Sequence, residues 1–531
     1  MILKVKLKAY HLIILATFFV IAIYACSLSV AYAEKSFSYK FYVDDNGHTN
    51  VTVFFYDTGN GSSWILIPKS QRDCVSITAY RGDILNVSYQ KLIEEGEENP
   101  FYVVMKFKYE TRDVVNLSIS YSMSYGSLII EPDAIFISPR VTHEETGFTK
   151  TITFLPGYAI TNKRDVSSFS GFIKDVEVTK RDDHVVVEVS ISSDDRVVIE
   201  YSVPFHCNMA DVTIGSFTFK TPSRYLDFAY DILKTLNESY AIYKDVFGTE
   251  LKNVEIQFFV PSMRDLITGL EGYVPFEAGK LGAIYLNVLY IRGVEGFMDV
   301  IALHELAHHF LWAIGVPPSR LWIHEGVAEY LSLTIGRSLG YAKAVDMHEG
   351  GLVSVWKELD DNLGFVQKWT PFYTPPQGLR YCYAASYYIF KTLCDEYGEL
   401  SYLKRLFKLF KGIDWSNDTQ IVEVFGLAAN NVTGIFALFH KWGFEFKEPL
   451  QMTLLISRVK RDVLSMPIWL EPYRSFAGIA IWIAELLQQY NVPCGTALMI
   501  KASELVYNVS PYLLLVSLVI VVMAIILSRR V

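Results

Sequence analysis

The sequence contains little cysteine and no long run of basic residues. It has six cysteines among 531 residues and a formal net charge of -9. A chain without a basic patch lacks the electrostatic footprint of a nucleic-acid-binding protein, so we expect no nucleic-acid partner. The cysteines are scattered along a long chain, which excludes a disulfide framework as the basis of the fold.

Hydrophobic residues, by contrast, are abundant. They make up 51% of the chain, and tyrosine and phenylalanine number 34 each. This composition excludes a disordered chain. A length of 531 residues exceeds what one hydrophobic core usually holds, so we expect two or three domains.

Both ends of the chain carry apolar segments. Residues 1–33 have the pattern of a signal peptide, which ends in the small-x-small sequence Ala31-Tyr32-Ala33; the alternative is an uncleaved N-terminal anchor. Residues 511–528 are uncharged and predict one transmembrane helix, followed by a cytoplasmic tail, 529–531, with Arg529 and Arg530. We therefore expect a single-pass protein of the cell membrane whose catalytic part is extracellular. Eight N-x-S/T sequons agree with an extracellular glycoprotein.

The hydrophobic pattern divides the chain between these segments. Short alternating stretches in residues 34–205 predict an all-β extracellular domain. Residues 206–345 combine strand and helix patterns and predict an α/β part, residues 346–450 predict a helical part of the same domain, and residues 451–510 predict a helical juxtamembrane region. The predicted fold class is multidomain: an all-β domain, an α+β domain with a helical C-terminal part, and one C-terminal transmembrane helix.

The segment HELAH places His304 and His308 four residues apart, with Glu305 directly after the first histidine. Residues four apart lie on one face of an α-helix, so both imidazoles can reach one zinc ion. Glu305 lies on the same turn, within reach of a water bound to that metal. The alternative for this segment alone is a chance HExxH sequence in a surface helix.

A second segment, WIHEGVAEY, supplies a third candidate ligand. Sixteen residues separate His308 from Glu325, a separation at which a helix, a turn and a second helix can bring a carboxylate back to the first helix. Catalytic zinc takes three protein ligands and keeps one position for water. We therefore predict one Zn2+ per chain, bound by His304, His308 and Glu325. Glu329 follows one turn later and is predicted to hold a ligand histidine in its tautomer.

HELAH followed by WIHEGVAEY resembles the gluzincin zinc metallopeptidases, which include thermolysin and the aminopeptidase N family. The resemblance covers about residues 222–446 and implies a thermolysin-like catalytic domain, in which Glu305 is the general base. The spacing between the two segments is slightly shorter than in relatives of aminopeptidase N, which indicates a shorter connecting turn. Tyr381 begins a segment similar to the Y-x-K-G-A sequence of that family and would steady the tetrahedral intermediate, and Tyr383 is the alternative.

The segment GAIYLN is similar to the G-A-M-E-N strand of aminopeptidases. Gly282 and Ala283 would bind the substrate backbone, with the substrate added as an edge strand. Tyr285 stands where that family has the glutamate that grips the amino group of the substrate. Because an unpaired buried ammonium is costly, an endopeptidase is slightly favoured over an aminopeptidase.

These patterns together predict a membrane-anchored extracellular zinc metallopeptidase. It would hydrolyse a peptide or protein substrate with a zinc-bound water, and Glu305 would act as the general base. Its partners would be this substrate and, through the C-terminal helix, the membrane. The alternatives are a catalytically inactive or non-peptidase surface binding protein of the same fold, and a zinc hydrolase that acts on other substrates.

Overall fold

The computed structural model describes residues 35–94, 96–204, 208–277, 279–446, 451–489 and 493–528. The predicted signal peptide, residues 1–33, and the predicted tail, residues 529–531, lie outside the described residues. The chain divides into two compact units. The first runs to Ala241 and includes Leu251–Leu306 and Leu331–His348, and the second contains Ile242–Glu250, Ala307–Tyr330 and the chain from Glu349 onward.

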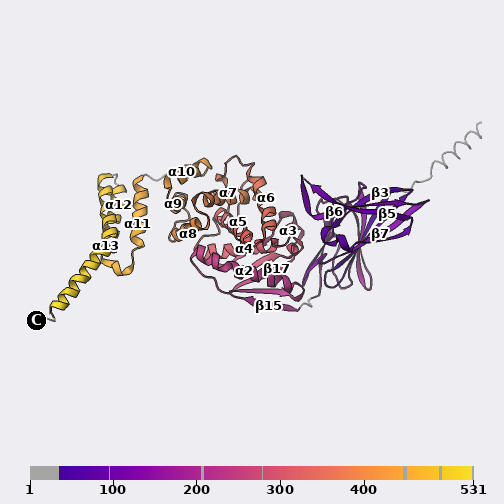
Figure 1. The fold of residues 1–531 in the computed structure, drawn as a ribbon, viewed down its shortest axis with the longest axis horizontal. Helices are drawn as coiled ribbons and strands as arrows, with labels where there is room; N and C mark the ends of the chain where they lie inside the picture. Colours follow the sequence, from indigo (N-terminus) through magenta and orange to yellow (C-terminus); the bar gives the residue numbers. More distant parts are fainter. Residues whose placement is uncertain are drawn as a thin grey trace, which may run out of the picture. The chain divides into compact units, whose positions relative to one another are not determined.

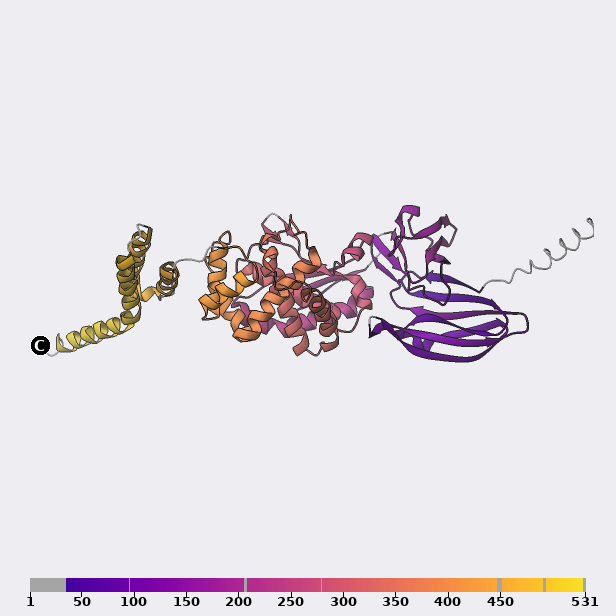
Figure 2. The same cartoon turned by 90° about the horizontal axis from the view of Figure 1, so that it is seen from above.

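The first unit begins with a β domain, as predicted (Figure 1 and Figure 2). Its three sheets have the strand orders β12-β13-β10-β1-β2-β7-β4, β11-β14-β9-β8 and β3-β6-β5. Successive side chains of a strand point to opposite faces, and in β2 one face is apolar: Val51, Val53 and Phe55 are fully buried, whereas Thr52 and Phe54 are partly exposed. The apolar faces of the sheets meet in one hydrophobic core.

The strands of this domain are β1 (Ser36–Val43), β2 (Thr49–Thr58), β3 (Gly61–Pro68), β4 (Ser76–Arg81), β5 (Asp83–Glu94), β6 (Glu97–Glu110), β7 (Val114–Met123), β8 (Ser127–Ile130), β9 (Asp133–Ile137), β10 (Phe148–Pro156), β11 (Val166–Ser168), β12 (Ile173–Lys180), β13 (His184–Ser192) and β14 (Val197–Ser202).

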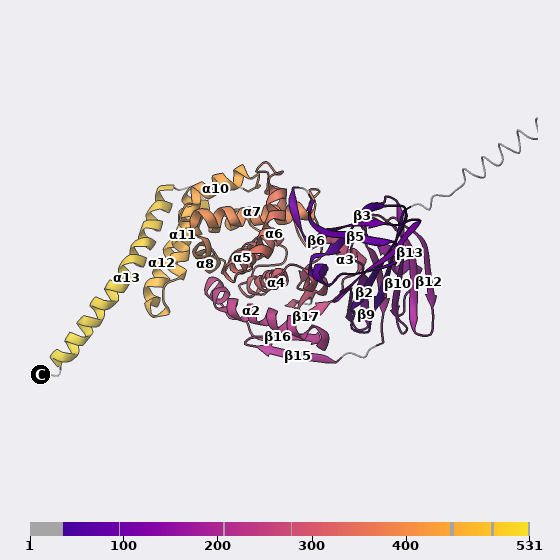
Figure 3. The ribbon, with the colours of Figure 1, turned by 45° about the vertical axis from the view of Figure 1, so that its right-hand side comes forward.

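A five-stranded sheet with the order β15-β16-β17-β21-β18 follows in the first unit. β16, β17 and β21 run parallel, whereas the two-residue strand β18 pairs antiparallel with β21 and ends the order on that side. Helix α2 connects β16 to β17 and lies along the sheet, with the rings of Phe217 and Tyr240 5.5 Å apart (Figure 3). The bounds are β15 (Met209–Ile214), β16 (Phe217–Pro222), α2 (Leu226–Phe247), β17 (Val254–Phe259), α3 (Met263–Thr268), β18 (Gly272–Tyr273), β19 (Phe276–Glu277), β20 (Lys280–Leu281) and β21 (Ile284–Asn287).

Helices make up the rest of the described chain. In the second unit the buried ring of Trp322 lies within 6.4 Å of the rings of Phe390, Phe425, Phe439 and Phe444, so aromatic packing forms much of this core. The helices are α4 (Phe297–Ala313), α5 (Leu321–Ser338), α6 (Ala342–Trp356), α7 (Leu379–Tyr397), α8 (Glu399–Leu409), α9 (Asp418–Ala428), α10 (Val432–Lys441), α11 (Gln451–Leu464), α12 (Glu471–Gln489) and α13 (Pro493–Ser528).

The prediction of a transmembrane helix at residues 511–528 is wrong. Among the residues that the structure describes, no helix combines the length and the apolar character needed to cross a membrane. The segment is the last part of α13, a helix of 36 residues that carries Lys501 and Glu504 in its earlier part. That earlier part packs with α11 and α12, where Ile500, Ala477 and Val459 are buried together. The predicted segment is thus part of a longer helix whose other residues pack within the protein.

Candidate metal centre

Helix α4 is a buried helix that nevertheless carries ionisable side chains. Leu303, Leu306, Phe310 and Leu311 are fully buried, and Gly315, with φ of 90°, follows the end of the helix. Glu305 is only 5% exposed. A buried carboxylate is costly without a partner, so its presence in an apolar helix points to a function.

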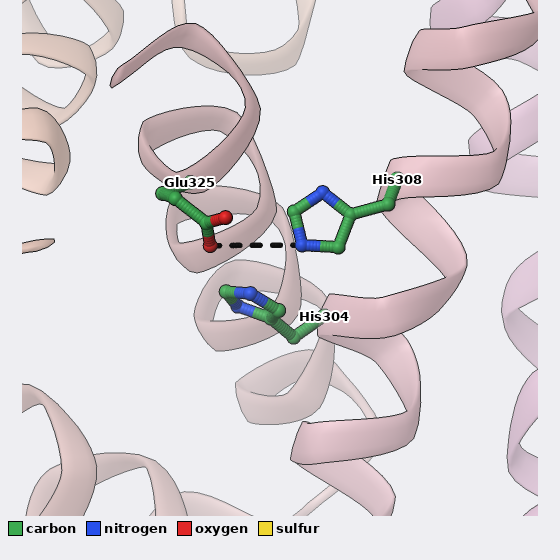
Figure 4. A group of neighbouring side chains, drawn as sticks. All are labelled: His304, His308 and Glu325. Carbon is green, nitrogen blue, oxygen red and sulfur yellow. Dashed lines mark ion pairs between the residues drawn. The ribbon is translucent and has the colours of Figure 1, made fainter. Parts of the chain in front are cut away.

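The structure brings the three predicted ligands together (Figure 4). His304 and His308 project from successive turns of α4, and Glu325 reaches them from α5. One ligand atom from each residue lies within 4.8 Å of the others, and Nε2 of His308 is 3.6 Å from Oε2 of Glu325. Tetrahedral zinc with bonds of about 2.0–2.2 Å needs ligand atoms about 3.4 Å apart. Two imidazole nitrogens and one carboxylate therefore fit a single zinc ion with an open position for water.

Glu305 faces the backbone of Gly272, at the edge of the sheet. A Cβ atom built on Gly272 would lie 2.8 Å from Oε1 of Glu305, so a side chain at this position would displace the carboxylate or the strand. The sequence analysis did not identify Gly272. A two-residue strand carries no periodic signal, and the contact depends on the pairing of Gly272 with Leu286 across β18 and β21.

The GAIYLN segment is not the edge strand that the sequence suggested. β21 lies between β17 and β18 and is paired on both sides, so no substrate can add to it as a further strand. Gly282 and Ala283 precede this strand, and the N–H of Gly282 donates to the carbonyl oxygen of Pro275 (2.8 Å). Binding of the substrate backbone by Gly282 and Ala283 themselves stays a prediction.

Glu271, a residue that the sequence analysis passed over, lies directly before Gly272. Its carbonyl oxygen accepts a hydrogen bond from the N–H of Asn287 (2.9 Å), which fixes the backbone beside Glu305. Its carboxylate oxygen Oε2 is 3.7 Å from Nδ1 of His348. A carboxylate thus stands one residue from the glycine that contacts the candidate base.

Glu329 is 4% exposed and lies one turn after Glu325 on α5. It lies near the hydroxyl of Tyr387, which donates to Oε1 of Glu349 (2.6 Å). Burial raises the pKa of Tyr387, and the hydrogen bond to Glu349 and the charges of Glu349 and Glu329 raise it further. The orientation of a ligand histidine by Glu329 stays a prediction.

Two tyrosines compete for the role predicted at the start of α7. The Tyr381 hydroxyl donates to Oε2 of Glu358 (2.6 Å). Helix α7 packs on α5 through Ser386 and Phe390, because a Cβ atom on Gly326 would lie within 2.6 Å of both. Tyr383, three residues before Ser386, lies on that face of α7, whereas Tyr381 is rotated away from it by about 140° at 3.6 residues per turn. The packing favours Tyr383, the alternative named above, over Tyr381.

Two further histidines near the ligands are neutral. Burial lowers the pKa of His324 and that of His309 to about 4. Nε2 of His324 lies 3.2 Å from the carbonyl oxygen of Val316, in the turn between the two helices. This contact anchors the start of α5 and gives His324 a structural role.

No protein-family model and no curated protein matches the sequence. Similar solved structures include native yeast LTA4 hydrolase, at 12% identity over 82% of this chain and 72% of that chain, with a TM-score of 0.33. An M1 zinc metallopeptidase from Deinococcus radiodurans is 12% identical over 78% of this chain and 94% of that chain, with a TM-score of 0.30. Legionella pneumophila aminopeptidase A in complex with aspartic acid is 12% identical over 76% of this chain and 49% of that chain, with a TM-score of 0.32.

The Deinococcus and Legionella neighbours are a zinc metallopeptidase and an aminopeptidase, the class of protein that the two motifs resemble. The identities and TM-scores are low. The function of the chain therefore rests on the geometry of its own site.

Proposed function

We propose that this chain is a zinc metallopeptidase. The observation that supports the proposal is the convergence of His304, His308 and Glu325 on one point beside the buried carboxylate of Glu305. A zinc ion held there would supply a water of lowered pKa and a Lewis acid for the scissile carbonyl. Glu305 would accept the proton of the attacking water and deliver it to the leaving nitrogen.

The edge of the sheet offers a place for the substrate backbone. β18 ends the strand order, and edge strands pair with extended peptides through their main-chain groups. Gly272 of β18 contacts Glu305, so a peptide added along this strand would lie beside the base. We therefore assign substrate backbone binding to β18 in place of Gly282 and Ala283.

Glu271 is the observation that supports an aminopeptidase over an endopeptidase. The preference for an endopeptidase rested on Tyr285, but Tyr285 belongs to the inner strand β21 and stacks on Tyr273, 5.0 Å away. Glu271 supplies the carboxylate that the sequence analysis did not find, one residue from the contact with the base. We propose Glu271 as the partner of opposite charge for the substrate ammonium, and on this basis we propose an aminopeptidase.

Export of the chain remains a proposal from its sequence. It rests on the signal pattern of residues 1–33 and on the sequons, of which all asparagines except the partly exposed Asn116 are exposed. Glycosidase treatment of the protein from its native source should reduce its apparent mass if these sites are used. An unchanged mass would show that these sites are not used and would remove this support for export.

The peptidase proposal is tested on purified protein. Metal analysis should find stoichiometric zinc in the wild type, and His304→Ala or Glu325→Ala should lose it. Glu305→Gln should keep the zinc and lower kcat by about 10²- to 10⁴-fold, the usual loss on removing a general base. Wild-type turnover in Glu305→Gln would contradict the proposal.

A pair of peptides that differ only in N-terminal acetylation tests whether the enzyme is an aminopeptidase or an endopeptidase. The free-amine peptide should be shortened from its N-terminus, and the acetylated one should resist. Glu271→Gln should reduce this preference, whereas Glu295→Gln, at an exposed position, should not. Equal cleavage of both peptides at internal bonds would show that the enzyme is an endopeptidase.

A further inference from the structure

Three arginines gather where β9 ends in the first unit. Nη1 of Arg292 donates to the carbonyl oxygen of Ile137, and Nη1 of Arg196 donates to the carbonyl oxygen of Ser138; both hydrogen bonds are 3.3 Å long. The N–H of Arg140, two residues further on, donates to the hydroxyl oxygen of Tyr102 (3.1 Å). Two guanidinium groups are thus held on adjacent carbonyl groups of one short segment.

In the described part of the chain, the ion pairs of this cluster within 4.0 Å involve only Arg140 among the three arginines. Arg140 forms ion pairs with Glu94 (2.6 Å) and with Asp194, which accepts from both Nε and Nη2. Neither Arg196 nor Arg292 has an ion-pair partner within 4.0 Å among the residues that the structure describes. The cluster therefore holds an excess of positive charge.

The surroundings of Arg292 and Arg196 favour an added anion. Arg292 is half-buried, and its pKa is lowered to about 10, first by burial and then by the charge of Arg196. A carboxylate between the two groups would remove this repulsion and could accept paired hydrogen bonds from a guanidinium. The Tyr102 ring lies under Arg196 (5.5 Å), and its hydroxyl, already an acceptor for Arg140, can donate its own proton.

The chain connects Arg292 to the candidate active site over a short distance. Arg292 ends the 3₁₀ helix η4 (Val288–Arg292), which begins directly after Asn287. Asn287 is hydrogen-bonded to Glu271 and Leu270 through its N–H and its side-chain amide. Five residues of 3₁₀ helix rise about 10 Å, the length of about three extended residues. The backbone of Arg292 thus lies about 10 Å along this helix from that of Asn287, a separation that a short extended peptide can span.

We propose that Arg292 and Arg196 bind a carboxylate group of the peptide substrate and make the enzyme selective for substrates that carry one near the cleaved bond. This proposal rests on the proposed peptidase function and deepens it. The carboxylate can be the C-terminus of a short peptide or the side chain of an aspartate or glutamate. Both sources offer the same chemistry to the two guanidinium groups.

The test compares matched peptides on the wild-type protein. One tripeptide is supplied as the free acid and as the C-terminal amide, and further amides carry glutamate or glutamine at each position in turn. The free acid or one of the glutamate peptides should be cleaved with a kcat/KM about 10- to 100-fold above that of its neutral partner, through KM, as expected for a charged hydrogen-bonded pair. Preference for the free acid identifies the C-terminus, and preference for a glutamate peptide identifies a side chain.

Variants separate recognition from a structural role. Arg292→Gln and Arg196→Gln should each remove most of this preference and leave cleavage of the neutral peptide within a few-fold of wild type. If the arginines had a purely structural role, these variants would change the cleavage of both peptides equally. Arg112→Gln, at an exposed turn, should keep the full preference.

Binding gives a second readout. The same peptides are titrated calorimetrically into Glu305→Gln, and the acidic peptide should bind more tightly than its neutral partner. If the wild type cleaves acidic and neutral peptides equally well, this inference is overturned while the peptidase proposal stands. If no peptide is cleaved at all, the peptidase proposal fails, and equal binding of the two peptides would overturn the arginine site separately.

Discussion

Gly272 shows how a residue without a side chain can shape a catalytic site. Its backbone occupies the space beside Oε1 of Glu305, and a methyl group there would collide with that oxygen. The carboxylate or the strand would have to move by a few tenths of an ångström or more. Proton transfer depends steeply on such distances, because a misplacement of about 1 Å can cost about 10²-fold in rate.

Gly272→Ala should therefore lower kcat by about one to two orders of magnitude while the zinc content stays unchanged. Steady-state kinetics and metal analysis on the same preparation check this. Gly350→Ala is the matched control, since a Cβ atom on Gly350 meets nothing within 4 Å. Wild-type kcat in Gly272→Ala would show that the carboxylate does not need this space.

At the level of residues, the sequence predicted contacts that follow from one helix or two adjoining helices. His304 and His308 share a face because of helical periodicity, and Glu325 is returned by a short turn. Glu271 and Gly272 were not predicted as site residues, because their position depends on the pairing of β18 with β21. Neither residue stands in a pattern that reports such a pairing.

Among the elements, the packing of helix α7 favours Tyr383 over Tyr381 as the tyrosine that serves the site. Its packing face toward α5 contains Ser386 and Phe390, and Tyr383 lies on this face. The ring of Tyr383 lies 5.2 Å from that of Trp369, which restricts its motion. The hydroxyl of Tyr381 is instead engaged by Glu358.

Tyr383→Phe should lower kcat by about 10²- to 10³-fold with little change in KM, the loss typical of one oxyanion donor. Tyr381→Phe removes the hydrogen bond to Glu358 and should leave kcat within a few-fold of wild type. The two variants are matched controls, because each deletes one hydroxyl from the same helix. A large loss in Tyr381→Phe alone would return the role to that residue.

Two predictions at this scale depended on neighbouring elements. The GAIYLN segment and residues 511–528 were both interpreted from their own letters, without their neighbours. β21 is an inner strand because the short β18 covers its edge, and residues 511–528 continue a helix whose earlier part is packed and charged. Edge position and helix continuity are properties of the assembled structure, which local composition does not determine.

For the whole molecule, the order of a β domain, an α+β part and helices could be predicted, because strand and helix periods differ. The β domain also contains a buried histidine, His143, whose effect on stability composition does not reveal. His143 is 5% exposed and stacks on Phe37, with ring centroids 4.3 Å apart. Its Nδ1 accepts the N–H of Glu145 (3.2 Å), so the ring is neutral, and Nε2 lies 2.7 Å from the hydroxyl of Thr149.

The last prediction concerns the pH dependence of this stability. Burial, and then the charge of Lys35, lower the pKa of His143 to about 4, whereas a histidine in the unfolded chain titrates near about 6.5. Between these values the unfolded chain binds a proton that the native protein does not, so stability is complete above about pH 6.5 and falls as the pH decreases toward 4. The shift corresponds to a loss of about 3 kcal/mol for this residue.

His143→Gln should remove this part of the pH dependence, because an amide can keep both hydrogen bonds and does not titrate in this range. Denaturant unfolding of the metal-free full chain between pH 4.5 and 7 measures it. The buried His309 and His324 contribute to both proteins alike and cancel in the comparison. The wild type should lose more stability than the variant on acidification, and parallel pH profiles would show that His143 is already protonated in the folded protein.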